Sequence, residues 1–116
     1  LMKLQDYIIN SNFKIIEAIE RMQIIKTRDL LIKKNKKIIG TVSEGDILRA
    51  ILRGKDLRST VDGVFNTNFK FVELGQENKV INIFKKEKVF IVPVFDKKFK
   101  LKRIITLSNF FDEFTK

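Results

Sequence analysis

Cysteine, histidine and tryptophan are absent from the 116 residues of the chain, and proline occurs once. Without cysteine, neither a disulfide framework nor a cysteine-based metal site can form. Without histidine, the chain lacks the commonest metal ligand and the commonest general base near neutral pH. No apolar run approaches the roughly 18 residues that span a bilayer, and no signal peptide is visible. We therefore expect a soluble, cytoplasmic protein with no metal site and no membrane partner.

The sequence also lacks the combinations of residues that are typical of catalytic sites. Acidic residues lie on an exposed helix side, as at Glu17 and Glu20, or flank a turn, as at Glu73 and Glu77. Nothing resembles an activated nucleophile or a glycine-rich loop that holds phosphate. We therefore expect no catalytic residues, no cofactor and no enzymatic activity in these residues.

The charge of the chain is strongly positive, with 24 lysines and arginines against 14 acidic residues and a net charge of +10. Much of this charge lies in two runs, 33–37 and 97–103, each between apolar strand-like segments where a hairpin turn is expected. The runs are either solvated turn tips or a nucleic-acid footprint, since basic patches bind phosphate backbones. The aromatic residues make nucleic acid the weaker alternative, because Phe84, Phe90 and Phe95 follow the apolar pattern of a core.

One order of elements occurs twice, and its first copy fills the first half of the chain. The apolar segment 4–9 leads to a helix whose apolar face includes Ile19 and Met22. Strands are expected at 30–32 and 38–42, joined by the first lysine run. A second, amphipathic helix follows them.

The second half repeats this order. The extended segment 69–74 precedes a helix with Val80 and Phe84 on one face. Strands are expected at 89–95 and 101–106, and a last helix is closed by three phenylalanines, Phe110, Phe111 and Phe114. The fold class is therefore α/β, with a hairpin within each half rather than a doubly wound sheet.

The segment 55–68 is polar and predicts a connector with one helical turn around Val61, Val64 and Phe65. The halves it joins are 2–54 and 69–116. Because Leu1 precedes Met2, we expect the natural chain to begin at Met2.

Gly54 and Pro93 each lead to a prediction about the local backbone. Gly54 lies just beyond the end of the second helix, where a left-handed cap favours glycine. Pro93 interrupts a strand pattern, which favours an edge position or a strand start.

The most informative feature is the junction between a strand and a helix at 38–49. Ser43 and Asp46 stand three positions apart at the helix start, which is the spacing of a capping box. The same hydroxyl and carboxylate, beside helix N–H groups, can hold a ribose and a phosphate. Arg49 is either a phosphate contact or a solvated charge. Gly45 either allows close packing against the partner half or a ligand, or is merely tolerated.

A weaker copy of this junction recurs about 63 residues later, at Thr106 and Asn109. Both residue types favour helix starts, so they are either cap residues or ligand contacts. One unit that occurs twice indicates a paired module rather than a single catalytic centre.

Residues 40–47, Gly-Thr-Val-Ser-Glu-Gly-Asp-Ile, resemble the closing motif of cystathionine-β-synthase (CBS) domains. Glu17, Ala18 and Met22 resemble the first helix of that family, and residues 92–96, Val-Pro-Val-Phe-Asp, resemble a strand of a second copy. The resemblance implies two β-α-β-β-α repeats related by a pseudo-twofold axis. It also implies a regulatory module that binds an adenine nucleotide, such as AMP, ADP or ATP, or a related ligand in the cleft between the repeats, and that forms a homodimer.

Residues 40–50 and 52–54 are similar to a narrower group, the CBS pairs that precede sugar-phosphate nucleotidyltransferase domains in bacterial surface-polysaccharide pathways. This similarity implies a bacterial protein and a C-terminal or associated nucleotidyltransferase as its partner. No glycine-rich nucleotidyltransferase motif is present in the chain.

The two copies depart from the family pattern to different degrees. Leu31 stands where the family usually has proline, whereas in the second copy Arg103 replaces the glycine and Asn109 the aspartate. Asn109 lacks the charge of a carboxylate, and Arg103 adds bulk where glycine would admit a ligand. We therefore expect one competent site around Ser43 and Asp46.

Two alternatives stay open at this stage. The first is a basic module that binds nucleic acid or another polyanion through its lysine-rich turns. The second is a structural dimerisation element whose nucleotide site has decayed.

Overall fold

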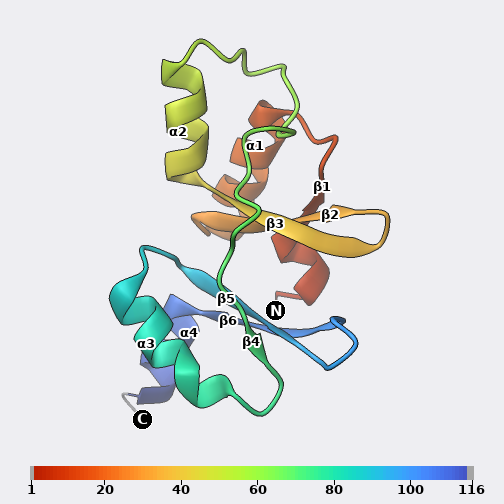
Figure 1. Cartoon of the computed structure of the whole chain (residues 1–116). Coiled ribbons are helices and arrows are strands. Elements are labelled where there is room, and N and C mark those ends of the chain that lie inside the picture. The colour runs from red at the N-terminus through yellow and green to blue at the C-terminus, as the bar shows by residue number, and fades with distance from the viewer. Residues whose placement is uncertain (1, 115–116) are drawn as a thin grey trace. The chain divides into compact units, whose positions relative to one another are not determined.

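The structure, a computed structural model, describes residues 2–114, and it describes side chains as far as Phe110. Of the phenylalanines expected to close the last helix, Phe111 and Phe114 lie outside the described side chains. The chain divides into two compact units, Leu1–Phe69 and Lys70–Lys116 (Figure 1). Each unit contains one three-stranded sheet. No helix within the described residues is long and apolar enough to cross a membrane.

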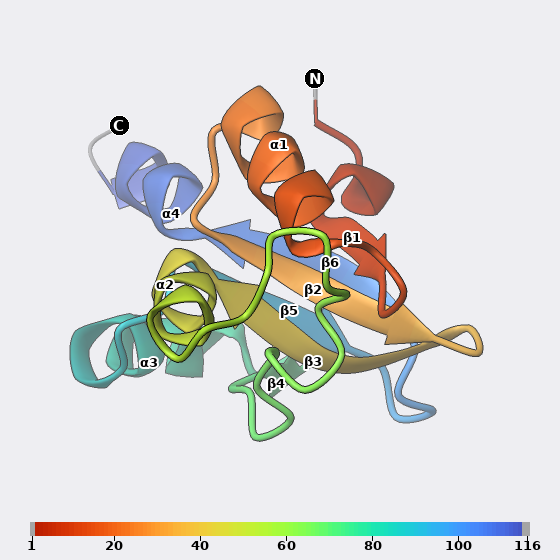
Figure 2. The ribbon, with the colours of Figure 1, turned by 90° about the horizontal axis from the view of Figure 1, so that it is seen from above.

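The first unit has a β-α-β-β-α order. A short 3-10 helix precedes these elements, which are η1 (Leu4–Tyr7), β1 (Ile8–Asn10), α1 (Ile15–Ile25), β2 (Asp29–Lys34), β3 (Lys37–Ser43) and α2 (Glu44–Leu52). β1 pairs with β2 in parallel, and β2 pairs with β3 in the antiparallel direction. Both α1 and α2 lie on the same face of this sheet (Figure 2).

The core of the first unit is built around β2, its central strand. Leu30 and Ile32 are fully buried, because they lie on the sheet face that packs into this core. Apolar side chains from both helices complete the core, among them Ala18, Met22, Ile47 and Ala50. Full burial of a side chain the size of Met22 or Ile47 contributes about 1.5–3 kcal/mol to folding, and that of an alanine less.

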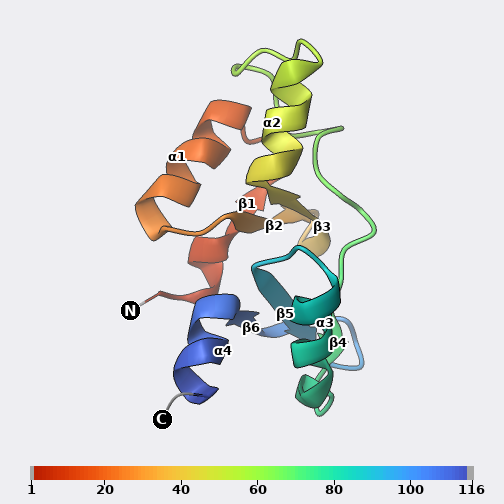
Figure 3. The same cartoon turned by 90° about the vertical axis from the view of Figure 1, so that its left-hand side faces the viewer.

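The second unit repeats the order in its own sheet. Its elements are β4 (Val72–Glu73), η2 (Glu77–Lys79), α3 (Val80–Lys86), β5 (Ile91–Phe95), β6 (Leu101–Thr106) and α4 (Leu107–Phe114). β4 is parallel to β5, and β5 is antiparallel to β6. Figure 3 shows α3 and α4 on one face of this sheet. The α/β class and the twofold occurrence of β-α-β-β-α are thus confirmed.

Several element boundaries differ from the sequence prediction. Most of the segment 4–9 forms η1, and β1 begins at Ile8. The connector contains turns rather than a helix, although the N–H groups of Val64 and Phe65 both donate to the Val61 carbonyl. The strand expected over 69–74 is reduced to β4, which is two residues long.

The prediction for Pro93 is wrong, because Pro93 lies in the middle of β5, the central strand of its sheet. The Phe95 carbonyl accepts from the Leu74 N–H at 2.7 Å, on the side of β4. Backbone groups two residues apart point the same way, so the Pro93 nitrogen also faces that side. The pairing of β4 extends over Val94 and Phe95 and stops short of Pro93. The absent N–H therefore removes no bond from the sheet.

The prediction for Gly54 is confirmed. Gly54 has a φ of +99°, its N–H donates to the Ile51 carbonyl at 2.9 Å, and the Lys55 N–H donates to the Ala50 carbonyl at 3.0 Å. These two bonds form a Schellman motif, which satisfies the last carbonyl groups of α2.

The connector packs against β3 at Gly40. Thr41 and Asn66 exchange backbone hydrogen bonds of 2.9 and 2.7 Å, so the connector pairs with the free edge of β3. A β-carbon on Gly40 would lie 2.5 Å from the Phe65 ring and 2.6 Å from the Asn66 carbonyl oxygen. In this unit the missing side chain at position 40 therefore admits the chain's own connector rather than a ligand.

Gly40→Ala should lower the free energy of unfolding by about 1–3 kcal/mol, because the new methyl group overlaps the ring and the carbonyl. Urea denaturation of the variant measures this loss. In a Phe65→Ala background the same substitution should cost less, since the ring contacts are gone. Equal costs in the two backgrounds would contradict this explanation of Gly40.

Candidate functional site

A reciprocal pair of hydrogen bonds forms where β3 ends and α2 begins. Ser43 has extended backbone angles, and its Oγ accepts from the Asp46 N–H at 3.1 Å. The Asp46 Oδ2 in turn accepts from the Ser43 N–H at 2.9 Å. The capping box expected from the spacing is therefore confirmed.

The second carboxylate oxygen of Asp46 binds Arg49. Arg49 Nη2 donates to Asp46 Oδ1 at 2.8 Å, one helical turn along α2. The Asp46 side chain is 19% exposed and that of Arg49 is 63% exposed. The pair therefore adds little stability, but it keeps the guanidinium beside the capping box.

The nearest neighbours of Gly45 belong to the same helix start. A β-carbon at Gly45 would lie 3.3 Å from Arg49 Nη1 and 3.6 Å from Ser43 Oγ. The Arg49 contact is with the end of a flexible side chain, so this geometry does not by itself require glycine at position 45.

One backbone N–H group at the start of α2, that of Gly45, is left for a ligand. The first four N–H groups of a helix have no acceptor within the helix. Here Ser43 donates to Asp46, Glu44 donates to the Arg28 carbonyl at 3.0 Å, and Asp46 donates to Ser43. The fourth N–H group belongs to Gly45, close to the Arg49 guanidinium. The junction thus combines a hydroxyl, a carboxylate, a guanidinium and a backbone donor.

The equivalent junction of the second unit is simpler. Thr106 Oγ1 accepts from the Asn109 N–H at 3.1 Å and lies 3.3 Å from Ser108 Oγ, so Thr106 caps α4. Thr106 is buried, whereas Asn109 is exposed. Arg103 approaches Glu77 at 3.8 Å. The sequence-predicted residues are therefore brought together as two sets, Ser43 with Asp46 and Arg49 in one unit, and Thr106 with Asn109 in the other.

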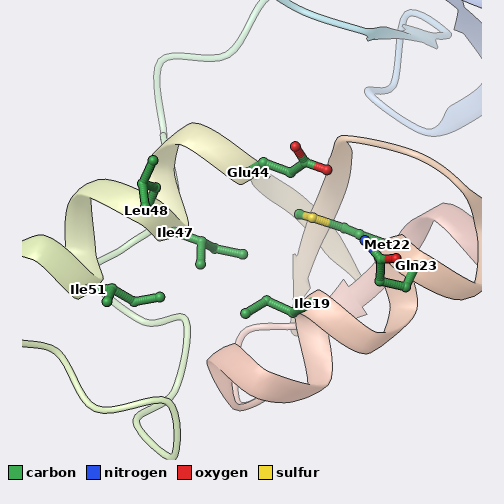
Figure 4. Close-up of a pocket in the computed structure, with 7 residues that line it drawn as sticks. All are labelled: Ile19, Met22, Gln23, Glu44, Ile47, Leu48 and Ile51. Carbon is green, nitrogen blue, oxygen red and sulfur yellow. The ribbon is translucent and has the colours of Figure 1, made fainter.

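A groove between α1 and α2 was not predicted from the sequence (Figure 4). It has a volume of about 380 Å³, and most of its lining is apolar. Its lining residues are Ile19, Met22, Gln23, Glu44, Ile47, Leu48 and Ile51. The apolar spacing of both helices was visible in the sequence, but their separation was not. In the described part of the chain, no group of three acidic residues could hold a metal ion.

Comparison with protein families finds a match in the first part of the chain. Residues 1–53 match the family model of the CBS domain. Among curated proteins, none matches the chain.

Solved structures extend the similarity to both units. A putative signal-transduction protein with CBS domains from Burkholderia ambifaria is 22% identical, with a TM-score of 0.82 over 93% of this chain and 81% of that one. A CBS domain pair/ACT domain protein from Thermotoga maritima is 20% identical, with a TM-score of 0.76 over 98% and 97%. A CBS-domain protein from Agrobacterium tumefaciens is 17% identical, with a TM-score of 0.79 over 95% and 94%. The fold is that of a CBS domain pair.

Ser43→Ala should lower the free energy of unfolding by about 1 kcal/mol, because the Asp46 N–H loses its acceptor. Ser43→Thr keeps the hydroxyl and should lose less. Calorimetric melting of the two variants measures the difference. An alanine variant as stable as the parent would show that the capping box contributes nothing.

Proposed function

We propose that this chain, whose fold is that of a CBS domain pair, is a regulatory module that binds an adenine nucleotide or a related ligand at Ser43, Asp46 and Arg49. CBS domain pairs are generally regulatory ligand-binding modules rather than enzymes. The observation that carries the proposal is the junction itself, where polar groups of four kinds meet at one helix start.

The ribose of the ligand is assigned to Asp46. Within the described residues its Oδ1 is held by the exposed Arg49 side chain alone, so a sugar hydroxyl can replace that guanidinium at small cost. A hydroxyl that donates to a carboxylate makes a charge-assisted bond, which is about twice as strong as a neutral one. The bond between Asp46 Oδ2 and the Ser43 N–H is retained, so α2 keeps its start.

The phosphate of the ligand is assigned to Arg49 and the Gly45 N–H. Once displaced from Asp46, the Arg49 guanidinium can pair with a phosphate oxygen in a bidentate manner. The N–H of Gly45 lies at the positive end of the α2 dipole and favours an anion. The net charge of +10 adds a general attraction for nucleotides.

The second junction is a weaker site in this proposal. Thr106 is buried and bound to its own helix, and Asn109 offers an amide where the first junction offers a carboxylate. These two residues remain candidate ligand contacts of lower affinity.

The regulated partner is proposed to be a sugar-nucleotidyltransferase, attached or associated, because residues 40–50 and 52–54 resemble the CBS pairs that precede such domains. The ligand can act on this partner only through a difference in affinity for two states of the module.

A second copy of the chain is the proposed partner of α2. Leu48, Ile51 and Leu52 are 58%, 37% and 77% exposed, which leaves an apolar helix face beside the α1–α2 groove. Contiguous apolar surface of this kind marks an interaction site. A homodimer through the helices that follow the hairpins would cover it.

Thermal melting against AMP, ADP, ATP, S-adenosylmethionine and nucleotide sugars tests the ligand proposal. A ligand at 100 times its Kd should add about 2.7 kcal/mol, which raises the Tm by several degrees. Asp46→Ala should abolish that rise, because the carboxylate is lost.

The matched control is Glu17→Ala. Glu17 Oε1 accepts from the Lys14 N–H at 2.9 Å at the start of α1, so this variant loses the same kind of helix-start bond outside the proposed site. It should keep the full ligand-induced rise in Tm. If both variants lose the rise equally, or if no ligand raises the Tm of the parent, the proposed site is wrong.

Leu48→Lys combined with Leu52→Lys should convert the dimer to a monomer in sedimentation velocity, because two charges enter the apolar face. Leu57→Lys, which alters an exposed connector leucine, should leave the dimer intact. A parent chain that sediments as a monomer, or a double variant that stays dimeric, would refute this interface.

A further inference from the structure

An aromatic cluster is exposed at the hairpin between β5 and β6. Phe99 stacks on Phe95 with ring centroids 4.0 Å apart and an angle of 11°, and Phe71 meets both rings edge-on at 5.4 Å. Phe95 is buried, whereas Phe71 and Phe99 are 46% and 44% exposed. They are the exposed aromatic side chains among the described residues.

Phe99 occupies a backbone position that disfavours it. The hairpin is closed by the Asp96 N–H, which donates to the Lys100 carbonyl at 2.9 Å, and Phe99 ends the loop with a φ of +60°. Glycine or asparagine is the usual residue in this left-handed conformation, and a bulky side chain there is strained. Stacking on Phe95 offsets part of that strain, and Phe99 still remains 44% exposed.

Asp96 fixes the shape of the hairpin. Its Oδ1 accepts from the N–H groups of Lys98 and Lys100, each at 2.9 Å. These bonds, that of Lys100 first, lower the pKa of Asp96, so the carboxylate is ionised at neutral pH. The loop that carries Phe99 is thereby held in one conformation.

Exposed lysines lie next to Phe71 and Phe99 in the chain. Lys97, Lys98 and Lys100 share the loop with Phe99 and are exposed. Lys102 is exposed beside them, with its Nζ 3.9 Å from Asp96 Oδ2, and Lys70 precedes Phe71 in the chain. Positive charge and an open aromatic face thus occur on one small surface of the second unit.

We propose that this surface, which we call the Phe99 hairpin and which comprises Lys70, Phe71, Lys97, Lys98, Phe99 and Lys100, binds single-stranded nucleic acid. A base extends the stack that Phe95 and Phe99 begin, and the lysines contact the phosphates on either side. Base–aromatic stacking and lysine–phosphate contacts are the two interactions that sequence-independent single-strand binding requires.

The ring geometry favours nucleic acid over an anionic membrane. A flat base can stack on the Phe99 ring parallel to Phe95, and this stacking contributes binding energy. The binding energy of an acyl chain does not depend on the orientation of the ring. Membrane attachment needs a larger apolar surface than two half-exposed rings held among lysines.

Fluorescence anisotropy of a labelled thymidine oligonucleotide of about 12 nucleotides tests the proposal with the intact chain. The parent should bind with an affinity that falls steeply with salt. Phe99→Asn removes the ring but tolerates the left-handed backbone, so the hairpin persists. It should weaken binding by at least about fivefold, the effect of losing one stacked base.

The two lysine hairpins of the chain provide a matched control. Replacement of Lys97, Lys98 and Lys100 by glutamine should reduce the slope of log affinity against log salt by about 2. The β2–β3 hairpin has a two-residue turn, Asn35–Lys36, and its exposed lysines have no exposed aromatic residue near them within the described first unit. The same replacement of Lys34, Lys36 and Lys37 removes equal charge and should weaken binding much less.

Three outcomes would overturn the proposal. The first is a parent chain that does not bind the oligonucleotide at moderate salt. The second is equal loss from the two lysine triples with no effect of Phe99→Asn, which would show diffuse charge attraction. The third is a parent that binds vesicles of phosphatidylcholine and phosphatidylserine through Phe99 while the oligonucleotide does not compete, which would assign the surface to membranes.

Discussion

In each unit of this protein, a helix must begin at the residue where the last strand of the sheet ends. A helix start leaves backbone N–H groups without acceptors, and the hydroxyl of Ser43 or Thr106 supplies one. The first unit adds the carboxylate of Asp46, which returns the bond. Because the first N–H groups of the helix need acceptors, polar side chains gather at the point where the strand ends and the helix begins. A ligand site can therefore develop there without new backbone structure.

The same bonds explain how the proposed ligand would be sensed. Asp46 already uses both of its oxygens, one for the Ser43 N–H and one for Arg49. A ligand that takes Oδ1 would exchange one weak, exposed pair for a stronger bond and would free the guanidinium for a second contact. The proposed binding thus replaces one side-chain contact beside an intact helix start, and any downstream effect depends on how differently two states of the module bind the ligand.

The order of elements could be predicted from the sequence, because hydrophobic spacing and the capping residues act locally. Gly54 has the left-handed backbone conformation expected from its position, because the geometry of a helix end depends mainly on local residues. The prediction for Pro93 is wrong because a central strand accepts proline only where its neighbour makes no hydrogen bond to that residue. This depends on where β4 ends, which is set by the tertiary structure and not by the local sequence. For the same reason, the contact between Gly40 and the connector was not foreseeable from the sequence. Phe99 lies in the second lysine run, where a turn is expected, but its stacking on the buried Phe95 depends on how the hairpin folds and could not be predicted from the sequence.

Amide NMR of the labelled chain during a titration with AMP or ATP tests whether the start of α2 holds a nucleotide. We expect saturable shifts that are largest at the backbone N–H groups of Ser43, Gly45 and Asp46, because these donors surround the proposed contacts. Shifts that saturate elsewhere, with these amides unmoved, would contradict the proposed site.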